Sequence, residues 1–516
     1  MKKAIVYLIL YLFVSLIYVS ARGQVIVHAS KDRVIKDVYI LASDSLRGRK
    51  FPDIGREKAA AYIAEQFSLA GLKAINENEE PYFQKIPVSK IDRGRTVIHK
   101  NEKIFRTGSR FSFAATKTLD DSLSLPVKFI GFSSSEKVGY TGPDTLVFFL
   151  AYDMIDVHNK LDELVEATGA KYFGFSIFKE RSIFQRFASN KSSNIISNER
   201  LLSGYQYPKG AFGIGAGHEH DWLYKYLPDK EEDFAVFMFD EELFEKFFYD
   251  TPVSMRRNSQ KSDRNGVLTE PVIKHLTFVT NFKLVEIFGL DDNVIGYIEG
   301  TDLKDEVVII CGHYDHLGKR GGNIYYGADD NASGTAAVME LARMFRQATD
   351  EGMEFRRTVV FIAFGAEETG LNGSYYYVTN PTFPIENTVL VINMDMIGRS
   401  DQLKDEPGHA IVQTMGSLRR QVWRAFRSVD KLIDDIELER AGLSFSSLAF
   451  YAGSDHFPFI REGIPAAVVN TGMHTDYHKP TDTPDKINYD NMVNIIRVVF
   501  VAASKVANEP KRFPRK

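Results

Sequence analysis

Four short apolar runs in the second half of the chain constrain the fold most. They read VVIIC, TVVFIAF, TVLVINM and AAVVN, and they are rich in β-branched residues. Such runs are typical of strands in a mainly parallel sheet whose two faces are covered by helices. Between the first two runs, SGTAAVMELARMF carries Ala337, Leu341, Met344 and Phe345 on one helical stripe. The pattern predicts an α/β fold with a doubly wound, mostly parallel central sheet and helices on both faces.

Acidic and histidine residues follow each of these predicted strands. The segments are GHYDH, GAEETG, DMIGR and TGMHTDYHKPTDT, in chain order. Each segment alone also fits an ordinary polar loop, but the carboxyl ends of parallel strands meet at the edge where active sites lie. Carboxylates that converge there repel one another unless a cation neutralises them. The succession of four therefore predicts a metal site.

The ligand types indicate which metal. Imidazole and carboxylate groups without a thiolate suit Zn²⁺ better than Ca²⁺ or Mg²⁺. Two histidines and three carboxylates are too many for one catalytic zinc ion with an open position. They fit two ions, about 3.5–4 Å apart, that share a bridging carboxylate.

The motifs GHYDH, GADDNASG, AFGAEETGLNGS, NMDMIGR and YHKPTDT resemble those of metallopeptidase family M28, the co-catalytic di-zinc exopeptidases. The resemblance covers residues 293–489 closely and residues 32–91 loosely. It implies two Zn²⁺ ions per chain, a zinc-exopeptidase fold and the following ligands. One ion is held by His313 and Asp395, the other by Glu368 and His478, and Asp330 bridges them.

The resemblance also implies roles for neighbouring residues. Asp330, the second aspartate of GADDNASG, corresponds to the bridging acid, and Asp329 does not. A cis peptide bond is expected between Asp330 and Asn331, where the family often has one. Asp315 matches the acid that orients the histidine ligand, and Glu367 matches the general base.

Several other polar residues have two interpretations. His474 is the alternative to His478 as a ligand, although the YHKPTDT match favours His478. His316 is interpreted as a loop residue near the site. Asp455 and His456, in SDHFPF, belong either to the substrate pocket or to local structure.

The remaining candidates are weaker. His218 and His220 lack a third ligand and are read as surface residues, and Cys311 is read as a core residue. Arg399 is the candidate cation for a substrate carboxylate, which a carboxypeptidase would require.

The chain divides into three predicted parts. Residues 1–23 have a basic start, an apolar stretch and small residues, which predicts a signal peptide, with a retained anchor as the alternative. Residues 24–118 and 256–516 form the predicted zinc peptidase domain. Residues 119–255 form a predicted inserted α/β module that resembles a protease-associated domain. Near the start, Ile63 and Phe67 lie on one face of a predicted helix that Gly71 ends.

These observations predict an exported peptidase, periplasmic or extracellular, that removes N-terminal residues from peptides. The alternatives are a glutaminyl cyclase-like acyltransferase, a carboxypeptidase of the same fold, and a non-enzymatic binding module, which would require lost ligands. The net charge of −4 argues against nucleic acid as a partner. No stable membrane insertion is expected after signal cleavage, and the single cysteine excludes an intrachain disulfide.

Overall fold

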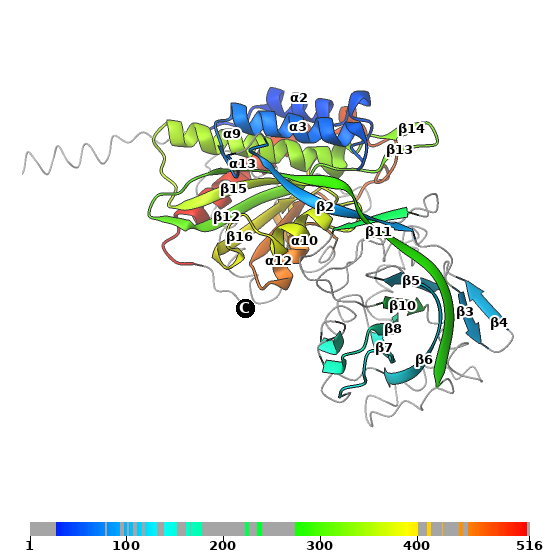
Figure 1. Cartoon of the computed structure of the whole chain (residues 1–516). Helices are drawn as coiled ribbons and strands as arrows, with labels where there is room; N and C mark the ends of the chain where they lie inside the picture. Colours follow the sequence, from blue (N-terminus) through cyan, green and yellow to red (C-terminus); the bar gives the residue numbers. More distant parts are fainter. Residues whose placement is uncertain are drawn as a thin grey trace, which may run out of the picture.

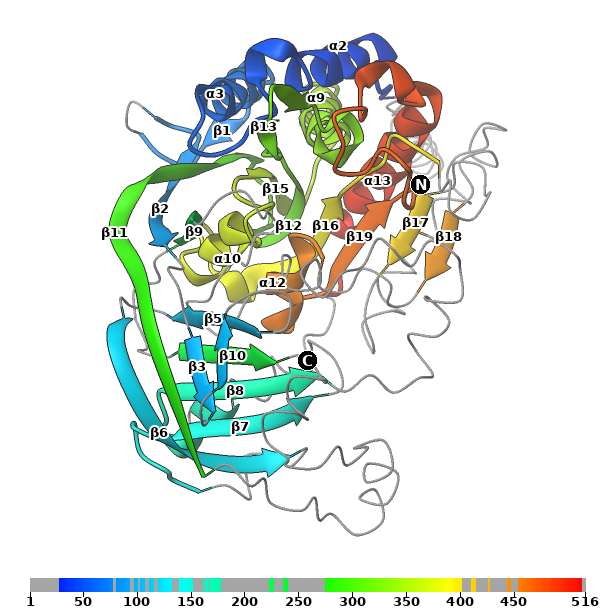
Figure 2. The same ribbon diagram turned by 90° about the vertical axis from the view of Figure 1, so that its right-hand side faces the viewer.

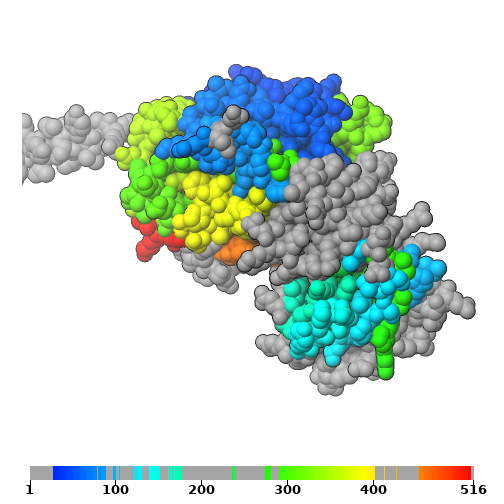
Figure 3. Space-filling model, in the orientation of Figure 1, coloured from blue at the N-terminus to red at the C-terminus, as the bar shows by residue number. Residues whose placement is uncertain are grey.

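The protein has two lobes of very different size (Figures 1 and 2). The computed structural model of the chain describes residues 27–77, 80–92, 97–100, 103–106, 111–115, 119–131, 139–151, 161, 163–165, 167–177, 222–226, 235–239, 274–400, 410–413, 426, 443–446 and 453–512. The long strand β11 (His275–Ile298) runs from one lobe into the other. In the space-filling view, the surface formed by residues 119–151 lies at the opposite end of the molecule from α2 (Lys31–Leu41) (Figure 3).

A mixed sheet forms the centre of the larger lobe. Its middle consists of β15 (Arg357–Phe364), β12 (Leu303–His313), β16 (Thr388–Met394) and β19 (Ala466–Asn470), each parallel to its neighbour. On one side, β11 joins β15 antiparallel and also pairs with β1 (Lys73–Ala74) and β2 (Phe83–Asp92). On the other side, β17 (Ala410–Gln413) joins β19 antiparallel and β18 (Leu443–Ser446) joins β17 parallel.

The apolar runs of the central strands are buried on both of their faces. Val308 and Ile310 of β12 face the core formed with α9 (Gly334–Asp350) and α13 (Tyr489–Asn508). Their neighbours Val307 and Ile309 face a second core, to which α10 (Asn372–Thr379) and α12 (His456–Arg461) contribute. This alternation follows from the two-residue period of a strand. Figure 1 shows the two helix layers on opposite sides of the sheet.

The predicted α/β class is confirmed. All four apolar runs form strands, and the segment after the first run forms α9. The prediction of a mostly parallel sheet holds for the four central strands. Of the outer strands, β1 and β2 pair antiparallel with β11, and β17 pairs antiparallel with β19.

The N-terminal helices cover α9. The predicted helix is α3 (Ile54–Leu69), in which Ile63 and Phe67 are fully buried. Gly71 adopts a φ of +70°, a left-handed conformation that costs little only for glycine, and the helix ends there as predicted.

The smaller lobe contains two sheets. One joins β6 (Leu119–Gly131), β7 (Leu146–Ala151), β8 (Tyr172–Ile177), β10 (Ala235–Phe239) and β5 (Phe111–Ala115). The other joins β3 (Val97–Lys100) and β4 (Lys103–Arg106) to β6 and β11. The lobe thus draws on strands before residue 119 and after residue 255. The module limits at 119 and 255, and its likeness to a protease-associated domain, stay predictions.

Some predicted features lie outside the described residues. They are the signal peptide at residues 1–23, the linker at residues 256–266, and His218 and His220. Within the described residues, no helix has the length and apolar character needed to cross a bilayer.

The packing of α9 against the sheet and against α13 can be tested at Phe345. Its ring on α9 lies 4.8 Å from that of Phe355, 5.7 Å from that of Phe361 on β15 and 4.8 Å from that of Phe500 on α13, between ring centroids. Because this buried ring joins three elements, we expect Phe345→Ala to lower the free energy of unfolding by about 3–5 kcal/mol.

Urea unfolding followed by fluorescence and circular dichroism measures this loss. Leu69→Ala, at a side chain that is 74% exposed, is the control and should change stability by less than about 0.5 kcal/mol. Equal stabilities of the Phe345 variant and the control would contradict the packing described.

Candidate active site

The predicted ligands gather at the carboxyl ends of the central strands. His313 is the last residue of β12, and Asp395 follows the last residue of β16. Asp330 comes from the turn Ala328–Ser333, directly before α9. The loop after β15 carries Glu367 and Glu368, and the segment after β19 carries His478. Segments up to 165 residues apart in sequence therefore meet at one edge of the sheet, as the strand order predicts.

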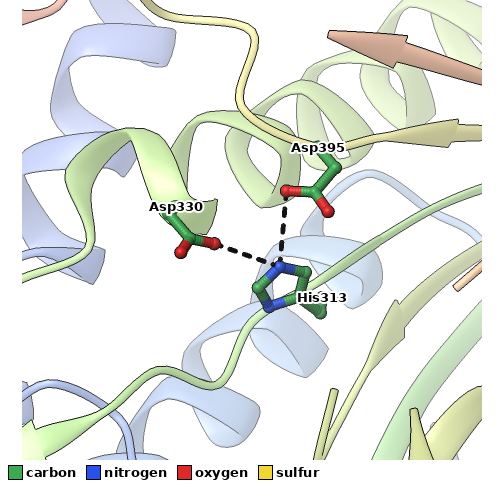
Figure 4. Close-up of side chains that lie close together, drawn as sticks. All are labelled: His313, Asp330 and Asp395. Carbon is green, nitrogen blue, oxygen red and sulfur yellow. Dashed lines mark ion pairs between the residues drawn. The ribbon is translucent and has the colours of Figure 1, made fainter. Parts of the chain in front are cut away.

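His313, Asp330 and Asp395 form the first group (Figure 4). The Nε2 atom of His313 lies 3.4 Å from Asp330 Oδ1 and 3.5 Å from Asp395 Oδ1. Glu367 Oε2 lies 3.8 Å from the same nitrogen. The three side chains point toward one shared space from β12, from the turn before α9 and from the loop after β16.

The second group shares Asp330 with the first. His478 Nε2 lies 3.0 Å from Asp330 Oδ2 and 3.3 Å from Glu368 Oε2. His316 Nδ1 lies 2.7 Å from the other carboxylate oxygen of Glu368, Oε1. The two oxygens of Asp330 thus face two different sets of imidazole and carboxylate groups, which is the position predicted for a bridging acid.

Neighbouring charges shift the pKa values of His478 and Glu368 in opposite directions. Burial by itself would lower the pKa of His478, but Glu368 and Asp330 raise it to about 10. Burial would raise the pKa of Glu368, but the neighbouring His478 and His316 lower it to about 2. The carboxylates therefore depend on positive charge supplied by their neighbours.

Glu367 differs from its neighbour. Burial raises the pKa of Glu367 well above the usual range of a carboxyl group, and the nearby acids Glu368, Asp455 and Asp395 raise it further, against the effect of His313. Of two adjacent glutamates, one is thus held ionised by imidazoles and the other is biased toward holding a proton.

Asp315 connects the histidine loop to the glutamate loop. Its carboxylate accepts hydrogen bonds from the backbone N–H of Glu367 at 3.0 Å and of Glu368 at 3.2 Å. One of its oxygens lies 3.7 Å from Nδ1 of His313. Asp315 is therefore placed to set the position of both glutamates as well as the tilt of the histidine ring.

The side chains of Asp329 and His474 contact each other and are not members of the two groups described above. His474 Nε2 is 3.1 Å from Asp329 Oδ2, and the other oxygen of Asp329 accepts a hydrogen bond from the N–H of Gly398 at 2.6 Å. Asp329 and His474 thus contact each other, whereas Asp330 and His478 belong to the second group. The sequence motifs favour the same two residues, Asp330 over Asp329 and His478 over His474. The peptide bond between Asp330 and Asn331 is cis, which confirms that prediction.

Two further side chains lock the turn that carries Asp330. Asp482 accepts hydrogen bonds from the N–H groups of Asp329 and Asp330. Asn331 donates to the carbonyl of Met394 at 2.9 Å and accepts from the N–H of Met396 at 3.2 Å. The turn is thus tied to both residues that flank Asp395.

Sequence reasoning underrated two residues. His316, interpreted as a loop residue near the site, contacts Glu368 directly. The ring of Tyr477 stacks on that of His478, with centroids 3.9 Å apart, and received no role. Burial and the surrounding carboxylates raise the pKa of Tyr477 well above its usual value, so its hydroxyl stays protonated. The adjacency of Tyr477 to His478 in YHKPTDT was the available signal.

Of the remaining residues named from the sequence, some lie beside the site and others lie in the core. Asp455 is fully buried, and burial with neighbouring carboxylates raises its pKa to about 7, against the effect of His313. This coupling places it beside the site, and His456 is buried next to it. Cys311 belongs to the core, as predicted. Arg399 pairs with Asp476 at 3.2 Å, which offsets its charge.

Curated relatives match less than half of the chain. Aminopeptidase YwaD of Bacillus subtilis is 28% identical over 228 residues, which cover 43% of this chain and 46% of the relative. A glutamate carboxypeptidase 2 homolog of Caenorhabditis elegans is 29% identical over 224 residues, which cover 39% of this chain and 28% of the relative. The chain thus spans less than half the length of these two relatives.

A solved structure shares the fold across both lobes. An aminopeptidase from Aneurinibacillus sp. strain AM-1 superposes with a TM-score of 0.52 at 18% identity, covering 95% of this chain and 96% of the other. The profile of Peptidase family M28 matches residues 293–503, which include β12 and each of the residues grouped above. Residues 293–503 of the chain are therefore a Peptidase family M28 domain.

Proposed function

We propose that the protein is an exported zinc aminopeptidase that removes N-terminal residues from peptides with the help of two Zn²⁺ ions. The observation that carries the proposal is the position of Asp330, whose two oxygens face separate groups of imidazoles and carboxylates. The aminopeptidases among the similar proteins support the reaction. Export is proposed from the sequence of residues 1–23.

The donor set fits zinc. His313, Asp330 and Asp395 would hold one ion. Asp330, Glu368 and His478 would hold the other. His316 also groups with Asp330 and Glu368 and contacts the other oxygen of Glu368. Asp395 Oδ1 is buried, has no hydrogen-bond partner among the described residues and faces His313 Nε2. A cation at this point would supply the partner that this oxygen lacks.

Bound zinc would lower the pKa of a water molecule and polarise the scissile carbonyl. Glu367 lies beside the ligand His313 without being needed as a ligand, so its carboxylate is free to accept the proton of the attacking water. Its raised pKa favours keeping that proton until the leaving amine takes it. The ring of Tyr477 stacks on His478, and its protonated hydroxyl would donate a hydrogen bond to the substrate carbonyl oxygen.

A carboxypeptidase is the second candidate, because one relative is a glutamate carboxypeptidase 2 homolog. That reaction requires a cation free to bind the substrate carboxylate. Arg399, the candidate named for it, already forms an ion pair with Asp476 at 3.2 Å. The aminopeptidase is therefore favoured. The full ligand set likewise disfavours a glutaminyl cyclase-like enzyme, which would use a single ion.

Glu367→Gln tests the general base. The amide cannot accept a proton, so we expect kcat to fall by about 10²–10⁴ while zinc content stays at the wild-type level. Aminopeptidase assays and metal analysis by mass spectrometry measure both quantities. Glu462→Gln, outside the ligand groups, is the matched control and should leave both unchanged. Substantial residual activity of the Glu367 variant would exclude this role.

Asp315→Asn tests the residue that orients the ligands. The amide keeps one acceptor oxygen for the two N–H groups of Glu367 and Glu368, so we expect zinc affinity to fall by roughly 10–100-fold with the fold retained. Competition with a chromophoric chelator measures the affinity, and circular dichroism monitors the fold. Asp302→Asn, at an ion pair with Arg356 on the surface, should leave affinity unchanged.

Peptides with free and blocked ends test the substrate. We expect cleavage of N-free, C-blocked peptides and none of N-blocked ones, with activity lost on dialysis against a chelator and restored by zinc at about two ions per chain. Cleavage of N-blocked peptides alone would establish the carboxypeptidase instead. Cyclisation of an N-terminal glutamine peptide without hydrolysis would establish the cyclase.

A further inference from the structure

Among the residues that the structure describes, Arg49 is a buried cation that has no carboxylate partner. Its side chain is fully buried, and its guanidinium donates hydrogen bonds only to backbone carbonyls among the described residues. The other buried arginines among the described residues differ from Arg49 because they have carboxylate partners. Arg56 pairs with Asp291 and Asp292, Arg357 pairs with Glu306, and Arg399 pairs with Asp476. Burying a charge is costly unless it is compensated, so the position of Arg49 calls for an explanation.

Three of the four carbonyls come from the segments that carry His313 and Asp330. Nε donates to the carbonyl of Tyr314, the residue between His313 and Asp315, at 2.6 Å. Nη1 donates to Tyr326 at 2.7 Å, and Nη2 donates to Gly327 at 2.9 Å. Gly327 directly precedes the turn that contains Asp330. One guanidinium thus bonds the histidine loop and the aspartate turn at the same time.

The backbone around Arg49 strengthens this connection. Nη1 also donates to the carbonyl of Leu41, the last residue of α2, at 2.6 Å. The N–H of His316 donates to the carbonyl of Arg49 at 3.3 Å, and the N–H of Gly318 donates to that of Gly48 at 3.0 Å. The segment around Arg49 therefore runs alongside the loop that follows β12.

The acids of the site supply the missing compensation. Burial lowers the pKa of Arg49 to about 10, and Asp315, Asp330, Asp482 and Glu368 oppose the shift. The guanidinium consequently remains charged at neutral pH, next to the most acidic part of the protein. Its planar fork also holds several acceptors in fixed directions, which the single ammonium of a lysine cannot reproduce.

We propose that Arg49 is a positioning residue of the metal site. By bonding the carbonyls on both sides of the gap between the two loops, it sets the distance between His313 and Asp330, the two ligands that face each other across the first ion position. This inference rests on the proposed zinc site, but it concerns the affinity for metal and not the reaction.

The test compares Arg49→Met with Arg357→Met in the full-length protein. Arg357 is the matched control because it is 1% exposed and also donates to two carbonyls, those of Val506 and Glu509, but it contacts none of the ligand loops. Zinc dissociation constants are measured by chelator competition, and thermal midpoints are measured in parallel.

We expect Arg49→Met to weaken zinc binding by roughly 10–100-fold, as the loss of residues that orient metal ligands typically does. Arg357→Met should lower the thermal midpoint and leave the zinc constant within about twofold of wild type, because destabilisation distant from the site does not alter ligand geometry. A folded Arg49→Met protein with wild-type zinc affinity overturns the proposal, and so does an equal loss of affinity in the Arg357 variant.

Arg49→Lys resolves the case in which Arg49→Met does not fold. The lysine keeps the charge and loses the fork, so we expect weakened zinc binding here too, and wild-type affinity would overturn the positioning role. If the wild-type protein itself binds no zinc, the proposed function fails, and that outcome is distinct from equal binding by wild type and variants.

Discussion

The parallel alignment of β15, β12, β16 and β19 is the constraint on which the rest of the larger lobe depends. Parallel strands end on the same edge, so the loops that follow them place their acids in one small volume. Within that volume, one carboxylate oxygen of Asp330 and one of Asp395 each lie within 3.5 Å of His313 Nε2. Such a concentration of buried carboxylate is stable only with compensating positive charge, from imidazolium groups or from bound cations.

Hydrogen bonds between loops fix the positions of the residues that meet at this edge of the sheet. Asp315 joins the histidine loop to both glutamates, Asn331 joins the aspartate turn to the strand end before Asp395, and Arg49 joins the turn to the histidine loop. Each connection uses a buried side chain whose partners are backbone groups. Because backbone groups move less than side chains, these bonds restrict the loops themselves, and the ligands inherit the restriction.

Much of the fold and site was predictable because the relevant signals are local. Apolar runs reveal strands, Gly71 reveals a helix end, and the motif GADDNASG separates Asp330 from Asp329. The role of His316 was not predictable in the same way, because its partner Glu368 is 52 residues away. The extent of the smaller lobe was equally hidden, since β11 is one continuous strand of 24 residues that serves two sheets.

The sequence by itself determined the α/β class, the apolar strands and the order in which acidic and histidine residues follow them. Periodicity and the order of residues express these properties directly, since each depends on neighbouring residues. Only the tertiary structure decided that β11 and β17 pair antiparallel, that Glu367 and Glu368 have opposite shifts in pKa, and that Arg49 reaches the carbonyls of Tyr314 and Gly327. These depend on burial and on contacts between distant segments, and neither exists until the chain has folded.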